Sequence, residues 1–201
     1  MDTQAFFVRQ WFLQNPAVQL RPLALSDVES LLPIALEPEL WKTGLTSIQD
    51  ADALRRYVEE ALAQRAQQQA YPFVVLDAQT GAYLGSTRFY EMDFFHKRLV
   101  LGWTWISAAA RGTGVNMAQK YELLRFVFEE LGFQRVGFYI DALNTRSRRA
   151  VQKLGATEEG ILRSHMITWT GRVRDTVVAS ILASEWPRLK ASVFSAWAVV
   201  P

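Results

Sequence analysis

Apolar residues recur with two periods along this chain, and each period predicts one kind of element. Alternation at every second position, or a short continuous apolar run, predicts a strand. Five such segments occur in the interior of the chain, and two more flank Thr170-Gly171 as a hairpin. The predicted strands are 18–22, 71–76, 83–90, 98–106, 135–141, 161–169 and 173–183.

Apolar residues at helical spacing predict four helices between these strands. They start at Ser26-Asp27, cover 50–69, cover 116–131 before Gly132, and run from the cap Asn144 to Leu154. The order is therefore a strand, two helices, three antiparallel strands, a helix, a strand, a helix and a closing hairpin. This order predicts a mixed α/β domain with a mostly antiparallel sheet, and it does not fit a doubly wound parallel sheet.

Composition narrows the class of protein without naming a function. The 201 residues are 50% hydrophobic and 21% charged, which suits one globular domain over 1–201. The chain has no cysteine, which excludes disulfides, a thiol nucleophile and thiolate metal sites. No metal site is expected. With 22 basic and 20 acidic residues the net charge is +2, so we expect no direct contact with nucleic acid.

The first residues do not have the pattern of a signal peptide. Asp2 is acidic where a basic start is needed, and Arg9 interrupts the apolar run. No segment approaches the roughly 18 apolar residues of a membrane helix. We therefore expect a cytoplasmic protein that does not bind membranes. The apolar N-terminal segment and the tail Ser195–Pro201 suggest surfaces that cover a partner subunit in a homodimer.

A glycine-rich turn, Ala110–Asn116, separates a predicted strand from the strongest predicted helix. Its glycines allow a tight turn, and the helix start offers free N–H groups and a partial positive charge to a phosphate. A dinucleotide-binding turn would need glycine at position 117, which is Met, and no P-loop lysine follows. The remaining alternatives are another phosphate ligand or a turn without a ligand.

Two segments together resemble the GNAT (Gcn5-related) N-acetyltransferase family. In the first, Arg111 and Gly114 match the family's Gln/Arg-x-x-Gly-x-Gly/Ala loop, and Asn116 departs from its last position. In the second, Asn144 is followed by Ser147 and Gly155 at the family's spacing. The segments ILRSHM and GRVRDTVVASILASEWP are similar to the closing hairpin of the RimJ/RimL-like group, which acetylates ribosomal-protein N-termini. The resemblance spans roughly 18–187.

This resemblance implies the GNAT acyl-CoA N-acyltransferase fold and acetyl-CoA as cosubstrate. It implies that backbone N–H groups before the loop face the pantetheine, that the loop binds the pyrophosphate, and that the second motif lies beside the cofactor. The basic residues Arg146, Arg148, Arg149 and Lys153 follow Asn144. They either contact the 3′-phosphate of CoA or form a solvated basic face. The cofactor-binding residues so implied are Trp105, Ile106, Ser107, Arg111, Gly112, Thr113, Gly114, Val115, Asn116, Asn144, Ser147, Arg149 and Lys153.

The implied reaction is the attack of an amine on the acetyl thioester. The tyrosine that protonates the leaving thiolate in many relatives is replaced by Val151, which leaves Ser147 as the candidate catalytic donor. Ser147 serves equally well as a cofactor contact or a helix cap. The base is open: Glu158, Glu159 and His165 are candidates, although His165 also suits a structural role and Glu159 a turn. An α-amino group, with a pKa of about 8, needs little help from a base.

Three functions of different classes remain. The first is acetylation of a primary amine, with a protein N-terminus ahead of a polyamine or an aminoglycoside. The second is a non-catalytic CoA-binding module, which the valine at 151 would suit. The third is an unrelated nucleotide binder. We expect the acceptor groove to involve 41–47 and 92–97.

Overall fold

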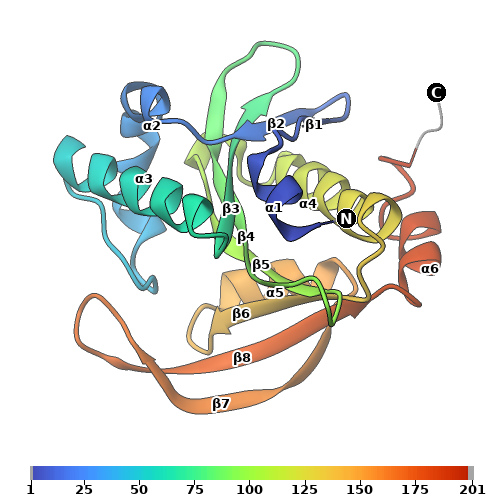
Figure 1. Ribbon diagram of the computed structural model, residues 1–201. Helices are drawn as coiled ribbons and strands as arrows, with labels where there is room; N and C mark the ends of the chain where they lie inside the picture. Colours follow the sequence, from blue (N-terminus) through green and yellow to red (C-terminus); the bar gives the residue numbers. More distant parts are fainter. Residues whose placement is uncertain (1, 199–201) are drawn as a thin grey trace.

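The computed structural model describes residues 2–198 and contains one sheet of eight strands in the order β1-β2-β3-β4-β5-β6-β8-β7 (Figure 1). Every neighbouring pair is antiparallel except β5 and β6, which are parallel. The strands are β1 Leu13–Gln14, β2 Val18–Pro22, β3 Ala70–Asp77, β4 Tyr83–Asp93, β5 Arg98–Ile106, β6 Arg135–Asp141, β7 Thr157–Ile167 and β8 Val173–Leu182.

Helices cover both faces of this sheet. The α-helices are α1 Thr3–Val8, α2 Val28–Ala35, α3 Ala51–Ala66, α4 Val115–Arg125, α5 Thr145–Lys153 and α6 Trp186–Ala191. Short 3-10 turns lie at Leu25–Asp27, Pro38–Leu40 and Ala108–Ala110, and a π-helical turn, Phe126–Glu130, extends α4. The mixed α/β class and the antiparallel sheet predicted from the pattern of apolar residues are confirmed.

Helices α1, α4, α5 and α6 lie on one face of the sheet (Figure 1). The larger apolar core joins them to the sheet through residues such as Phe73, Phe89 and Val136. The N-terminal segment belongs to this core: Phe6, Phe7 and Trp11 are buried. These three side chains therefore cover the protein's own sheet, whereas Val8 and Phe12 of the same segment are exposed, so a partner subunit covering them stays a prediction.

Helices α2 and α3 cover the opposite face (Figure 1). A second apolar core packs Leu54, Tyr57 and Val58 of α3 against Val74 of β3 and Trp105 of β5. Helix α3 starts at Asp50, whose carboxylate accepts the Ala53 N–H at 2.7 Å. This cap satisfies one of the free N–H groups of the first turn. Because side chains along a strand point alternately to the two faces, every second residue of each strand packs into one core and the residues between them pack into the other.

The pairing of β5 with β6 is short, and this opens the middle of the sheet. Only Arg98–Val100 pair with Arg135–Gly137, and beyond these residues the two strands separate. Beyond the last pair, β5 and β6 no longer pair with each other. The gap between them is therefore open to both faces of the sheet. Helix α4 begins after β5, so the loop before α4 lies at the open end of this gap.

Several elements differ from the prediction, and three of the differences concern α1, β7 and α4. Helix α1 was not predicted, because six residues are too few to show a helical period. Strand β7 begins at Thr157, so Glu158 and Glu159 lie in a strand and not in a turn. The helix predicted over 116–131 begins at Val115 and changes to π geometry at Phe126.

Within the described residues, none of the helices combines the length and apolar character that crossing a bilayer requires.

Candidate active site

One cavity of about 920 Å³ occupies the gap between β5 and β6 and reaches both faces of the sheet. Its walls come from β5, β6, α4, α5 and the segment after the Pro38–Leu40 turn. Leu101, Phe138, Ile140, Val151 and Leu154 form an apolar wall on the α4–α5 face. A cavity with an apolar wall and basic side chains in its lining suits a long chain that carries phosphates at one end.

The glycine-rich loop before α4 is held by its own backbone geometry and by one ion pair. Gly112 and Gly114 have φ angles of 80° and 93°, which residues with a Cβ rarely adopt. The Thr113 hydroxyl donates to the Ala110 carbonyl at 2.7 Å, which closes the turn. Arg111 Nη2 donates to Glu37 Oε2 at 2.9 Å, so this cation is already partnered by a carboxylate.

No side chain caps the start of α4. Gly114 is the N-cap residue and has no side chain to offer, so the N–H groups of the first turn receive no side-chain acceptor. Among the described residues, Asn116 is the first α4 side chain that lines the cavity. The helix start therefore has the donors that an anionic ligand needs.

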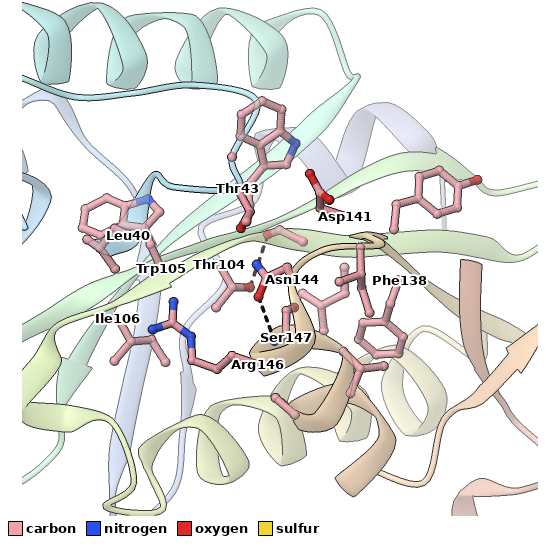
Figure 2. Close-up of a pocket in the computed structure, with 18 of the residues that line it drawn as sticks. Leu40, Thr43, Thr104, Trp105, Ile106, Phe138, Asp141, Asn144, Arg146 and Ser147 are labelled. Carbon is pink, nitrogen blue, oxygen red and sulfur yellow. Dashed lines mark hydrogen bonds between the residues drawn. The ribbon is translucent and has the colours of Figure 1, made fainter. Parts of the chain in front are cut away.

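Helix α5 forms the other wall of the cavity. The Asn144 carboxamide accepts the Ser147 N–H at 3.0 Å, and Figure 2 shows this bond beside the open space. The cap uses the backbone of Ser147, and its hydroxyl makes no hydrogen bond to another described residue. Arg149 and Lys153 line the cavity, as does Arg146. Arg148 does not line this cavity. It forms an ion pair with Glu158 at 3.2 Å, which fits the alternative of a solvated basic face.

A bulge in β5 lies at the centre of the cavity. The register with β4 jumps between Ser86 and Arg88, and Trp103 has a φ of 52° in the bulge. The Thr104 side chain points to the α4 side of the sheet. Its hydroxyl lies 2.7 Å from the hydroxyl of Thr87, a residue of the neighbouring strand β4. Thr104 of β5 and Asn144 before α5 both line the cavity, and Figure 2 shows both side chains.

Lys120 is the residue of this site that the sequence analysis missed. It projects from α4 into the cavity wall, is 5% exposed, and donates to Thr104 Oγ1 at 2.8 Å. Burial without a carboxylate partner lowers the pKa of its amine to about 7. The signal available in the sequence was a lysine on the buried face of a strong helix, between Met117 and Tyr121.

Most of the predicted cofactor residues meet at this cavity. Its lining includes Trp105, Ile106, Arg111, Gly112, Asn116, Asn144, Ser147, Arg149 and Lys153. Ser107, Thr113, Gly114 and Val115 do not line it in this structure. Gly114 lies against Trp197 instead, whose ring is 3.5 Å from the position that a Cβ would take. This part of the C-terminal tail therefore packs on its own chain, and 199–201 lie outside the described residues.

The proposed bases do not reach the cavity centre. Glu159 forms an ion pair with Arg135 and accepts the Ser180 hydroxyl at 2.8 Å, and Glu158 pairs with Arg148. His165 packs edge-on against the Tyr139 ring at 6.1 Å, which is the structural alternative. The carboxylates that line the cavity are Glu91 and Asp141.

Only one of the two segments expected at the acceptor groove lines the cavity. Trp41, Thr43 and Leu45 line the cavity, as predicted for 41–47. The segment 92–97 does not line it: Phe94 packs on Phe6 at 5.4 Å in the N-terminal core. Within residues 2–198, no three His, Cys, Asp or Glu side chains come together in a group able to hold a metal ion.

Comparisons with known proteins agree with this geometry. The model of the acetyltransferase (GNAT) domain family matches residues 17–157. YdaF of Bacillus subtilis, provisionally named a ribosomal N-acetyltransferase, is 29% identical over 106 residues, which span 53% of this chain and 57% of YdaF. A crystal structure from T. thermophilus, provisionally named an acetyltransferase, is 32% identical with a TM-score of 0.82, covering 92% of this chain and 96% of that one.

RimJ of Mycobacterium smegmatis, solved with CoA-disulfide, shares the fold at 22% identity and a TM-score of 0.76, with 93% of each chain covered. The family model spans more than half of the chain, and it covers the helix α4 loop and the α5 motif on which the resemblance rested. The chain belongs to the GNAT family and is an acetyl-transferring enzyme.

Proposed function

We propose that this protein transfers the acetyl group of acetyl-CoA to a primary amine, with a protein N-terminal α-amino group as the leading acceptor. The observation that carries the proposal is the gap between β5 and β6, because it joins an uncapped helix start on one side to an open pocket on the other. YdaF, whose provisional name gives a ribosomal activity, supports a protein acceptor.

The residues present fit acetyl-CoA. The pyrophosphate fits the N–H groups at the start of α4, next to Gly112 and Asn116. Arg149 and Lys153 line the cavity with free cationic groups that suit the 3′-phosphate. The apolar wall suits the pantetheine arm. Arg111 serves mainly to fix the loop, since Glu37 already neutralises it.

The chemistry needs an oriented amine, a stabilised oxyanion and a proton for sulfur. The amine nitrogen forms a bond to the acetyl carbon, and the carbon–sulfur bond of the tetrahedral intermediate then breaks. Backbone N–H groups of β5 beyond its pairing with β6, around Trp105, are the candidate donors to the oxyanion. The Ser147 hydroxyl, which has no partner among the described residues, supplies a hydrogen bond to the leaving thiolate.

Calorimetric titration with acetyl-CoA tests the proposal, using two matched glycine variants. Gly112 and Gly81 both have positive φ, 80° and 71°, and both have open space around the position of a Cβ. Only Gly112 lines the cavity. Gly112→Glu places strain and negative charge beside the pyrophosphate, so we expect at least about a hundredfold loss of affinity. Gly81→Glu carries the same strain and should keep the affinity.

Micromolar binding by the wild-type protein and by Gly81→Glu, lost in Gly112→Glu, supports the cofactor site. Acetyl transfer to a panel of peptides and small amines then tests the reaction. Binding of acetyl-CoA without transfer to any amine would favour a non-catalytic CoA-binding module, and no binding at millimolar acetyl-CoA would exclude the proposed reaction. The homodimer and the cytoplasmic location stay predictions, to be checked by light scattering and cell fractionation.

A further inference from the structure

Two buried arginines lie on the α2–α3 face of the sheet without a carboxylate partner. Arg88 of β4 is 2% exposed and Arg174 of β8 is 5% exposed. The ion pairs found among residues 2–198 involve neither side chain. Buried cations are normally paired, because an unpaired charge is costly to remove from water. Two such cations on one face of the sheet, one of them in the cavity lining, indicate that an anion belongs there.

Arg88 is held rigidly just behind the cavity wall. Its guanidinium lies between the rings of Tyr57 and Trp103, 4.9 and 4.7 Å from their centroids. Its Nη1 donates to Gln64 Oε1 at 3.0 Å, while Nε and Nη2 have no partner. The aromatic rings stabilise the charge but accept no hydrogen bond from these two donors. Arg88 therefore supplies fixed positive potential to the cavity.

Arg174 lines the cavity itself, and its Nε is buried without a partner. Burial is the main cause that lowers the pKa of its guanidinium, with Asp141 acting in the opposite direction. That carboxylate is occupied elsewhere: Asp141 pairs with Arg172 and accepts the Leu143 N–H at 2.9 Å. Arg174 is thus a cation at the cavity wall with donors left for a ligand.

These groups lie on the α2–α3 face of the sheet, opposite the loop before α4. Arg88 and Tyr90 alternate with Phe89, which faces the α4 side, so both point to the α2–α3 face. Asp141 and Arg174 share that face, since Asp141 is opposite Thr176, two residues beyond Arg174. The acetyl-CoA loop belongs to the other face. The two halves of the cavity meet at the β5 bulge.

The phenol groups around Arg174 also suit an anion. The Tyr90 and Tyr139 rings meet edge-to-face at 6.4 Å, and burial is the main cause that raises the pKa of both hydroxyls. Both phenols therefore remain protonated and able to donate at neutral pH. Of the two cavity carboxylates, Glu91 is exposed and acts on the two phenols, and Asp141 forms its ion pair with Arg172, so neither forms an ion pair with Arg174.

We propose that the acceptor amine carries a carboxylate of its own, which Arg174 binds on the α2–α3 face while Arg88 adds positive potential behind it. This proposal rests on the proposed function and narrows its substrate class. A polyamine or an aminoglycoside brings only positive charge to this corner and is repelled. The carboxylate comes either from a free amino acid or from an acidic side chain near the N-terminus of a peptide.

Matched acceptors test this on the wild-type protein. One pair is a peptide amide beginning Ser-Asp against the same peptide beginning Ser-Asn, and the other is a free amino acid against its amide. Spermidine is the cationic comparison. We expect kcat/KM to be at least about tenfold higher for the carboxylate member of one pair, from a charge-assisted contact. The pair that shows the preference identifies the source of the carboxylate.

The outcomes separate the two proposals. Equal rates within both pairs, or a preference for spermidine, would overturn this inference and leave the acetyltransferase function intact. If the protein transfers acetyl to none of these amines and to no other amine of the broader panel, both proposals are overturned.

Two variants then assign the preference to a residue. Arg174→Gln should reduce the carboxylate preference to near unity, because kcat/KM falls more for the carboxylate member of the pair than for the uncharged member. Arg163→Gln is the control, because Arg163 is an exposed arginine on the neighbouring strand β7. If Arg174→Gln lowers both members of the pair equally, Arg174 is a structural residue and the proposal is wrong.

Discussion

The two sides of the cavity are assembled in different ways. On the α4–α5 side, the candidate cofactor residues come from three short segments, 105–107 at the end of β5, 111–116 at the start of α4 and 144–153 along α5. On the α2–α3 side, Tyr57, Arg88, Trp103 and Arg174 come from α3, β4, β5 and β8. The first arrangement is a local motif, whereas the second exists only once the sheet has formed.

This difference matches the chemistry of the two ligands. A phosphate needs backbone N–H groups, which any glycine-rich helix start provides, so one short motif serves a whole family. An acceptor must be distinguished from other amines by side chains, and these can be changed one strand at a time. Under the proposed function, the α4–α5 side determines which cofactor binds, and the α2–α3 side determines which amine is accepted.

The largest effect is expected at the strand contact that joins the two sides. A Cβ on Gly85 of β4 would lie 2.0 Å from the Trp105 carbonyl oxygen, a backbone atom that has little room to move. Gly85→Ala should lower the free energy of unfolding by about 3 kcal/mol or more and weaken acetyl-CoA binding, because it displaces β5 at the gap. Urea unfolding and calorimetry measure both effects.

Gly137→Ala is the matched control in β6. Its Cβ would meet Val100 at an ordinary 3.5 Å, so we expect a loss below about 1 kcal/mol. If both alanine variants are equally stable, the close approach of β4 to β5 at Gly85 is not what fixes the position of β5 at the gap.

An intermediate effect is expected at Lys120, where the buried amine lies beneath the bulge. Replacing it with methionine removes an unpaired buried charge, so Lys120→Met should stabilise the protein at pH 6 by about 1–2 kcal/mol. The folded-state pKa is lowered to about 7, below the unfolded value. Between these two values the unfolded chain binds the proton and the folded protein does not, so wild-type stability rises with pH.

The advantage of Lys120→Met should therefore shrink as the pH rises from 7 toward 10. Unfolding in urea at pH 6, 8 and 9.5 tests this, with exposed Lys97→Met as the control for a surface charge. A loss of stability at every pH would show instead that the hydrogen bond to Thr104 outweighs the cost of burial.

The smallest effect is expected at Ser147, on the α4–α5 side. The helix cap uses its backbone N–H, so Ser147→Ala keeps the cap and should leave the melting temperature nearly unchanged. If the hydroxyl donates to the leaving thiolate, kcat falls about tenfold, which corresponds to about 1.4 kcal/mol, while KM for acetyl-CoA stays constant. A rise in KM alone would make Ser147 a cofactor contact and not a catalytic residue.

Sequence reasoning was most accurate where structure is local. The strands 18–22, 98–106 and 135–141 were predicted with the boundaries that the structure shows. The loop before α4 was identified because Gly112 and Gly114 have a conformational role that only glycine fills easily. Longer range contacts were missed: the ion pair of Arg111 with Glu37 joins residues that no local pattern connects.

The sequence by itself determined the class of fold, the order of its elements and the helix start that suits a phosphate, because periodicity and glycine placement act within a few neighbouring residues. Only the tertiary structure decided that β5 and β6 separate after three paired residues, that Lys120 is buried without an acidic partner, and that Arg88 and Arg174 share one face. The reason is that desolvation and charge pairing depend on atoms brought together from distant parts of the chain, which residue spacing does not encode.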